Sequence, residues 1–225
     1  TLRIWKYNNE SDVLQPVKVI ENCHRGKHVW SGDIDLLDLQ LCCTGGADGR
    51  VRLHDLQREN QVTIKLTLHD FAKQLLNMES GVSFNPKDCI RDYFELINLN
   101  KLVCLTSNGY VIEYDYESKC CTVVYQNDKL AGFGIVDGFN DLNLVVVADR
   151  SGKLTNIQYG KENNNPNVSQ IESHDETMKI TNLLTSSTNG RYFVLIESPN
   201  VKIPLILHEV NVAVNGCDDS VDIAQ

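Results

Sequence analysis

Short stretches in which apolar and polar side chains alternate recur along the chain, and turn residues separate them. In the stretch 50–55, two arginines alternate with Val51 and Leu53, which is the period of a half-buried β-strand. Asp48 and Gly49 directly precede this stretch, and a two-residue Asp-Gly connection supplies the positive φ values of a type I′ hairpin. We therefore expect a strand, a tight turn and a returning strand here.

This hairpin pattern is repeated. Gly49 begins the first returning strand, a similar strand begins 60 residues later at Gly109, and another begins 43 residues after that at Gly152. The chain also opens on such a strand, and a degenerate copy lies at 204–209. Four short strands per repeat at this spacing are typical of propeller blades. The sequence thus predicts an all-β fold, a β-propeller with about four to five blades present that belongs to a larger ring or multi-propeller protein.

The central repeat resembles a WD-repeat blade, because residues 44–55 read Thr-Gly-Gly-Ala-Asp-Gly-Arg-Val-Arg-Leu-His-Asp and follow a loop that contains histidines. On this basis the whole chain, 1–225, is one partial WD-repeat propeller. We expect the outer half of a blade at 1–22, blades at 23–68, 91–127, 128–173 and 174–215, an insertion at 69–90 and a tail at 216–225.

The same resemblance implies a structural hydrogen-bond network in the central blade, formed by His28 (or His24), Thr44, Asp48 and His54, with His54 in place of the usual tryptophan. His28, Thr44 and Asp48 also look like parts of a hydrolase triad. No nucleophile elbow and no Gly-rich nucleotide loop accompanies them, however, so we expect a structural role and no catalytic, cofactor-binding or metal-binding residues.

The amino-acid composition indicates the redox state of the cysteines and the expected location of the protein. The eight cysteines include adjacent pairs but no C-x-x-C spacing, so reduced thiols are expected. No apolar run of 18 residues and no charged-then-apolar leader is present, so we expect no membrane span and a cytoplasmic protein.

Charge is unevenly distributed. Residues 1–75 carry as many acidic as basic side chains, and the net charge of −9 falls on 76–225. Generic nucleic-acid binding by the whole chain is therefore poorly supported. The best local candidates for contacts with tRNA or another partner are Arg25, Lys27, Arg50 and Arg52.

Three segments together, 23–33, 44–54 and 105–115, resemble the WD-repeat protein six family and its large fungal members. The resemblance implies a non-catalytic subunit that binds an FtsJ-like methyltransferase and positions tRNA for 2′-O-methylation of the wobble nucleotide. S-adenosylmethionine would be bound by that partner, and this chain would have no cofactor and no small-molecule substrate. Two alternatives stay open. One is a protein-only adaptor, such as a trafficking or ubiquitin-ligase substrate receptor, and the other is an enzyme that uses His28 and Asp48.

Overall fold

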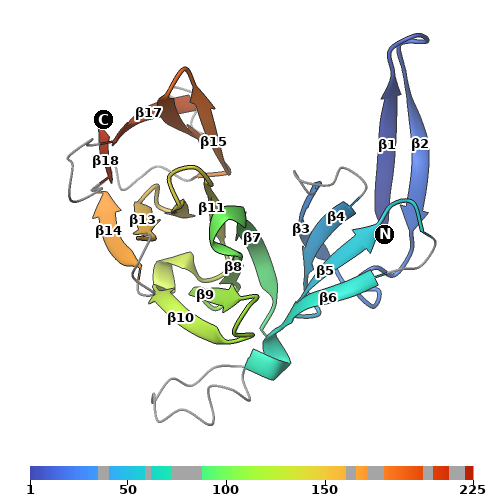
Figure 1. Ribbon diagram of the computed structural model, residues 1–225, viewed down its shortest axis with the longest axis horizontal. Helices are drawn as coiled ribbons and strands as arrows, with labels where there is room; N and C mark the ends of the chain where they lie inside the picture. The colour runs from blue at the N-terminus through green and yellow to red at the C-terminus, as the bar shows by residue number, and fades with distance from the viewer. Residues whose placement is uncertain are drawn as a thin grey trace. The chain divides into compact units, whose positions relative to one another are not determined.

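The computed structural model describes residues 1–34, 41–58, 62–71, 88–160, 166–171, 180–199, 205–212 and 221–224. Within these ranges the strands form one two-stranded sheet and four four-stranded sheets, shown in Figure 1. In all four larger sheets the strands are paired in sequence order, so each is a simple meander. The predicted all-β architecture is confirmed.

The strand bounds are as follows. The two-stranded hairpin is β1 (Leu2–Asn8) and β2 (Val13–Ile20). The first sheet is β3 (Val29–Ile34), β4 (Leu41–Gly46), β5 (Arg50–Asp55) and β6 (Val62–Thr67). The second sheet is β7 (Ile90–Leu96), β8 (Lys101–Thr106), β9 (Tyr110–Asp115) and β10 (Cys121–Gln126). The third sheet is β11 (Gly134–Phe139), β12 (Leu144–Asp149), β13 (Leu154–Gln158) and β14 (Asn167–Ile171). The fourth sheet is β15 (Asn182–Thr188), β16 (Arg191–Glu197), β17 (Leu205–Val212) and β18 (Val221–Ala224). Two short 3-10 helices, η1 (Ile97–Leu99) and η2 (Asp128–Leu130), lie between strands.

The chain divides into two compact units, Thr1–Arg91 and Asp92–Gln225. In the first unit, the β1–β2 hairpin is tied to the first sheet by Lys18, whose Nζ donates to the carbonyl oxygens of Asp55 (2.7 Å) and Arg58 (2.9 Å). A helical turn over 68–71 follows β6, and its Leu68 and Phe71 are fully buried. The predicted insertion from residue 72 to residue 87 lies outside the described residues.

Gly49, Gly109 and Gly152 occupy equivalent turns, each between the second and third strands of its sheet. Their φ angles are +71°, +81° and +95°. In all three turns the glycine N–H donates to the carbonyl oxygen three residues earlier, at 3.0, 3.1 and 3.2 Å. The repeat found in the sequence is therefore a repeat of hairpin tips, as the propeller prediction requires.

The turn type at Asp48-Gly49 differs from the expectation. Gly46 pairs with Arg50 across the hairpin, so three residues rather than two form the loop, and within it only Gly49 has a positive φ. A type I′ turn needs positive φ at both central residues. A three-residue loop that ends in a left-handed glycine also reverses the chain, and it needs a positive φ at only one residue.

In the second unit, β12 explains why residues 144–148 read as an unbroken apolar run. Successive side chains of a strand point to opposite faces. Leu144, Val146 and Ala148 pack into a core shared with the fourth sheet, while Val145 and Val147 pack into a core shared with the second sheet. The third sheet is thus covered on both faces, as expected for a blade between two neighbours.

The same kind of hydrogen bond, from a backbone N–H to an aspartate side chain, joins these neighbouring sheets twice. Asp92 Oδ2 on β7 accepts from the N–H of Val136 on β11 at 2.9 Å. Asp137 Oδ2 on β11 accepts from the N–H of Thr185 on β15 at 2.7 Å. The first strands of consecutive sheets are therefore joined in the same way twice.

The predicted tail at 216–225 needs correction. Val221–Ala224 forms β18, which pairs antiparallel with β17. The edge of β17 offers backbone N–H and C=O groups, and the next strand in the chain, β18, pairs with them. The acidic composition of this segment hid the strand.

Candidate functional site

The central feature of the first unit is a buried chain of hydrogen bonds on the first sheet. His24, in the loop before β3, is fully buried; its Nδ1 lies 2.6 Å from Asp48 Oδ1 and its Nε2 lies 2.9 Å from Thr44 Oγ1. Thr44 Oγ1 in turn lies 2.8 Å from His54 Nε2 on β5. Arg52 completes the set, because its Nη2 donates to Asp48 Oδ2 at 2.7 Å. The network joins a loop, two strands and a hairpin turn.

The direction of donation is defined for one of the two contacts of His24. A carboxylate only accepts, so His24 Nδ1–H donates to Asp48. Thr44 Oγ1 lies between His24 Nε2 and His54 Nε2, and the hydroxyl can both donate and accept a hydrogen bond there. An indole, the group that the WD-repeat resemblance leads us to expect at this position, can only donate. His54 Nε2 lies beside Thr44 Oγ1, where the indole N–H of a tryptophan would be expected.

Burial and neighbouring charge set the protonation of the network. Burial by itself would raise the pKa of Asp48, but the hydrogen bonds from His24 and Arg52 outweigh it and lower that pKa to about 2. Burial, followed by the positive charges of His24, Arg52 and Lys18, lowers the pKa of His54 to about 4. Asp48 is thus ionised and His54 neutral at neutral pH. None of these groups has the geometry of an activated nucleophile, because Thr44 Oγ1 is fully buried between two imidazoles.

Gly46 explains how the imidazole of His24 reaches this position. A Cβ on Gly46 would lie 2.2 Å from His24 Nδ1, so the ring packs directly on the backbone of β4. A strand position beside a close-packed group of this kind requires glycine. The Gly-Gly pair at the end of β4 therefore serves the network as well as the turn.

The structure brings together Thr44, Asp48 and His54 as expected, but His28 is not part of the network. His28 is exposed, and its ring centroid lies 5.2 Å from that of Trp30. Between the two histidines the chain reverses, with Arg25 and Gly26 at positive φ and the Lys27 N–H bonded to the His24 carbonyl. Because of this turn, His24 enters the network, as the alternative assignment had it, and the first choice, His28, does not.

The four basic residues expected to contact tRNA or another partner fall into two groups, one paired within the chain and one open to solvent. Arg52 is paired with Asp48 and only 13% of its side chain is exposed, so it presents little surface to a partner. Arg25 and Lys27 are exposed, and Arg50 is half-buried at the start of β5. The Ala47 N–H donates to the His28 carbonyl at 2.9 Å. This bond holds the loop beside the hairpin, which places the three remaining basic residues at one end of the sheet.

Sequence reasoning did not assign Trp30 and Arg91 to this end of the first unit. Trp30 lies where the pairing of β3 with β4 shifts by one residue, and a bulge of this kind re-aims a side chain. The indole is 43% exposed, and Arg91 Cζ lies 4.1 Å from its ring centroid. The alternation of basic and aromatic residues over 25–30 was the available signal. We call the resulting set the basic–aromatic rim: Arg25, Lys27, His28, Trp30, Arg50 and Arg91.

Solved structures with a similar fold were found. The β-propeller domain of Myceliophteria thermophila Cps50 (Swd1) matches with a TM-score of 0.56 and 10% identity, over 88% of this chain and 59% of that one. The fold is that of a β-propeller. Raptor from Chaetomium thermophilum matches with a TM-score of 0.54 and 14% identity, over 82% of this chain and 16% of that one. The chain thus spans about three fifths of the Swd1 propeller and a much smaller share of Raptor.

No known family profile matches the propeller sequence. No curated protein matches it either. In the described part of the propeller, no group of three or more His, Cys, Asp or Glu side chains is placed to hold a metal ion. No helix within the described ranges is long and apolar enough to cross a membrane.

Proposed function

We propose that this propeller is a non-catalytic scaffold that binds an FtsJ-like methyltransferase and positions tRNA for 2′-O-methylation of the wobble nucleotide. The enzyme and the modified nucleotide come from the resemblance of segments 23–33, 44–54 and 105–115 to the WD-repeat protein six family. The scaffold lowers the entropic cost of orienting a flexible anticodon loop against the active site of the partner. S-adenosylmethionine is bound by the methyltransferase.

The basic–aromatic rim is the observation that best supports an RNA contact. Arg25 and Lys27 are exposed cations beside an aromatic pair, His28 and Trp30. Single-stranded RNA is bound by this combination, because cations attract the phosphates while unstacked bases stack on aromatic rings and on guanidinium planes. The residues of 1–75 have no net charge, so the acidic excess of the chain does not lie on this part of the sequence.

If the rim contacts tRNA, the protein should bind the unmodified anticodon stem-loop of a tRNA. Its affinity can be measured by fluorescence anisotropy at several salt concentrations. Arg25→Ala and Lys27→Ala should each weaken binding and lower the salt slope by about one phosphate contact. Trp30→Ala should cost about 1–3 kcal/mol in binding, the value of one stacked base, with little change in salt slope.

Lys119→Ala and Lys129→Ala are matched controls, because both lysines are exposed in the second unit, outside the rim. They should leave the affinity for the stem-loop unchanged. Equal loss of affinity in the control and rim variants would refute a tRNA site at the rim. The catalytic assignment is tested separately, by reconstituting methyl transfer. Transfer should require the methyltransferase and S-adenosylmethionine and should be lost without the propeller.

A protein-only adaptor is the second candidate, and the β1–β2 hairpin favours it. Half or more of each of five large apolar side chains is exposed there, and exposed apolar patches are typical of protein docking surfaces. These residues are Trp5, Val13, Leu14, Val17 and Val19. An adaptor should bind the stem-loop no better than a DNA duplex of equal charge, while Leu14→Lys should abolish capture of its protein partner. Preferential stem-loop binding that is lost in the rim variants would exclude it as the main function.

A further inference from the structure

One arginine of the basic–aromatic rim packs on an aromatic ring. Arg91 is the second residue of β7, and its Cζ lies 4.1 Å from the ring centroid of Trp30 on β3. This distance is close to the contact distance of carbon atoms, so the guanidinium lies against the face of the indole. The contact restricts a long side chain that would otherwise adopt many conformations in solvent. Arg91 is therefore preorganised for a ligand in a way that an exposed lysine is not.

The hydrogen-bond donors of this guanidinium are not used within the chain. Among the residues that the structure describes, none forms a hydrogen bond or an ion pair with the side chain of Arg91. Arg52 differs, because its Nη2 donates to Asp48 Oδ2 at 2.7 Å. A guanidinium that stacks on a ring directs its N–H groups outward in its own plane, and it has no acceptor. The ligand of Arg91 must therefore offer acceptors at the edge of the guanidinium.

The indole of Trp30 is also partly open. Its exposed fraction is 43% even though Arg91 lies on its ring. Flat apolar surface of this kind is the usual platform for an unstacked nucleic-acid base. A planar group that pairs with the edge of the guanidinium extends the same layer and covers the indole surface that Arg91 leaves exposed. The two residues together select a ligand that is both planar and rich in acceptors.

Guanine meets both requirements. Its O6 and N7 are adjacent acceptors on one edge, and a single guanidinium can donate to both of them in the plane of the base. On the corresponding edge adenine has an acceptor and a donor, and cytosine has a donor. A phosphate also pairs with a guanidinium, but it has no flat surface with which to cover an indole. The guanine base is therefore the ligand that satisfies Arg91 and Trp30 at once.

We propose that Trp30 and Arg91 form a site for an unpaired guanine of the bound RNA, in which Arg91 donates to O6 and N7 and Trp30 stacks against the base. The assignment rests on the proposed tRNA contact and adds a base preference to it. Arg25 and Lys27 are exposed at the same end of the sheet and contact phosphates. Phosphate contacts position an RNA, while contacts to a base edge give specificity.

Hairpin RNAs with a common stem and an oligouridine loop test the base preference. The nucleotide at the centre of the loop is guanosine, adenosine or 7-deazaguanosine, and fluorescence anisotropy gives the affinity of the full chain for each hairpin. The guanosine hairpin should bind about tenfold more tightly than the adenosine hairpin, the value of one bidentate pair. The 7-deazaguanosine hairpin lacks the N7 acceptor and should bind more weakly than the guanosine hairpin.

Two outcomes of this experiment separate the base preference from the tRNA contact. Equal affinities for the guanosine and adenosine hairpins would overturn the guanine site alone, because the protein would still bind RNA. Failure of every hairpin and of the anticodon stem-loop to bind would overturn both.

Arg91→Lys keeps the positive charge and removes the planar pair of donors. It should reduce the preference for guanosine over adenosine to about twofold or less, with little change in affinity for the adenosine hairpin. Arg150→Lys is the matched control, because Arg150 is exposed in the second unit and its Cζ lies 6.0 Å from the ring centroid of Phe133. It should retain the full preference. A loss of affinity in Arg91→Lys that is equal for all hairpins would indicate a phosphate contact and overturn the assignment to a base.

Tryptophan fluorescence reports the stacking directly. Trp5 and Trp30 are the two tryptophans of the chain, so Trp5→Phe leaves Trp30 as the sole indole emitter. In this variant the guanosine hairpin should quench the emission with the affinity that anisotropy gives, and inorganic phosphate at equal ionic strength should not. Unchanged emission at a saturating concentration of the guanosine hairpin would contradict the stacked base, even if Arg91→Lys failed to fold.

Discussion

The two neighbouring histidines, His24 and His28, allow a sharp test of the buried network. His24→Ala removes the hydrogen bond to the Asp48 carboxylate (2.6 Å) and the one to the Thr44 hydroxyl (2.9 Å). A hydrogen bond to a charged group is worth about 1.5–3 kcal/mol and a neutral one about 0.5–1.5 kcal/mol. The expected loss of unfolding free energy is therefore about 2–4 kcal/mol. For a chain of this length it corresponds to a fall in melting temperature of roughly 5–15 °C.

His28→Ala is the matched control, because the same ring is removed from an exposed position in the same loop. It should change the unfolding free energy by no more than about 0.5 kcal/mol. Urea denaturation followed by circular dichroism gives both values. Equal stability of the two variants, or a larger loss in His28→Ala, would refute the network as described.

A double-mutant cycle adds a check that does not depend on absolute magnitudes. Thr44→Val also removes the hydrogen bond to His24, so the combined loss in His24→Ala with Thr44→Val should be smaller than the sum of the single losses. Coupling of about 0.5–3 kcal/mol is usual for side chains in one network. Strict additivity would mean that the two residues do not interact.

Three further predictions concern the same framework. A Cβ on Gly46 would lie 2.2 Å from His24 Nδ1, so Gly46→Ala should destabilise the protein strongly by urea denaturation, and far less in a His24→Ala background; an equal loss in both would contradict the packing. A Cβ on Gly109 would lie 2.4 Å from the Asn127 carbonyl oxygen, whereas Gly132, with a similar φ of +75°, has nothing within 4 Å. In thermal melts, Gly132→Ala should lower the free energy of unfolding by about 1 kcal/mol, and Gly109→Ala should lower it clearly more. Similar losses in the two variants would argue against the close contact between Gly109 and Asn127. The pKa of His54 falls from 6.5 to about 4 on folding, so between these values the unfolded chain binds a proton that the folded chain does not. Stability should therefore fall by about 3 kcal/mol as pH drops from about 6.5 to about 4, and His54→Gln should flatten this dependence; an unchanged pH profile would refute it.

Some features of this protein were accessible from sequence because they depend on local chemistry. A left-handed turn position selects glycine, so Gly49, Gly109 and Gly152 marked the hairpin tips wherever they occurred. An unbroken apolar run such as 144–148 is typical of a strand buried on both faces, and the structure buries it so. Both signals act over a few residues, and they were sufficient for the repeat and the all-β fold.

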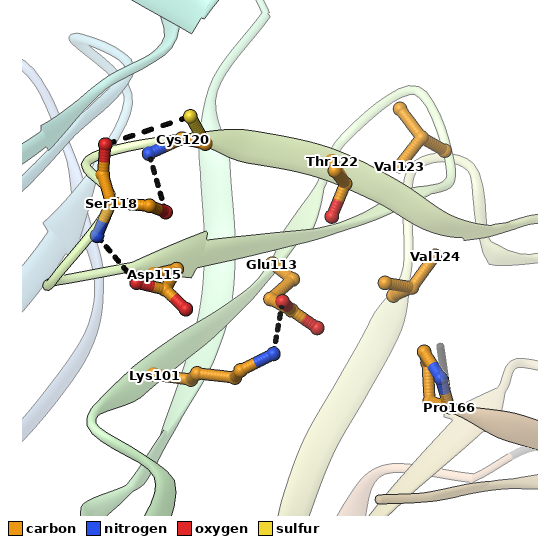
Figure 2. A pocket seen from close by; sticks show the side chains of 9 residues that line it. All are labelled: Lys101, Glu113, Asp115, Ser118, Cys120, Thr122, Val123, Val124 and Pro166. Carbon is orange, nitrogen blue, oxygen red and sulfur yellow. Dashed lines mark hydrogen bonds and ion pairs between the residues drawn. The ribbon is translucent and has the colours of Figure 1, made fainter. Parts of the chain in front are cut away.

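Other features depended on contacts between distant residues, and only the tertiary structure decided them. His24 rather than His28 enters the sheet because a turn at Arg25 and Gly26 points the first ring at a gap above Gly46. β18 pairs with β17 even though the acidic residues around Val221 and Ile223 masked the short apolar–polar alternation of a strand. The buried ion pair of Lys101 and Glu113, drawn in Figure 2, forms only where β8 and β9 meet, since the burial of both groups is a property of the assembled sheet.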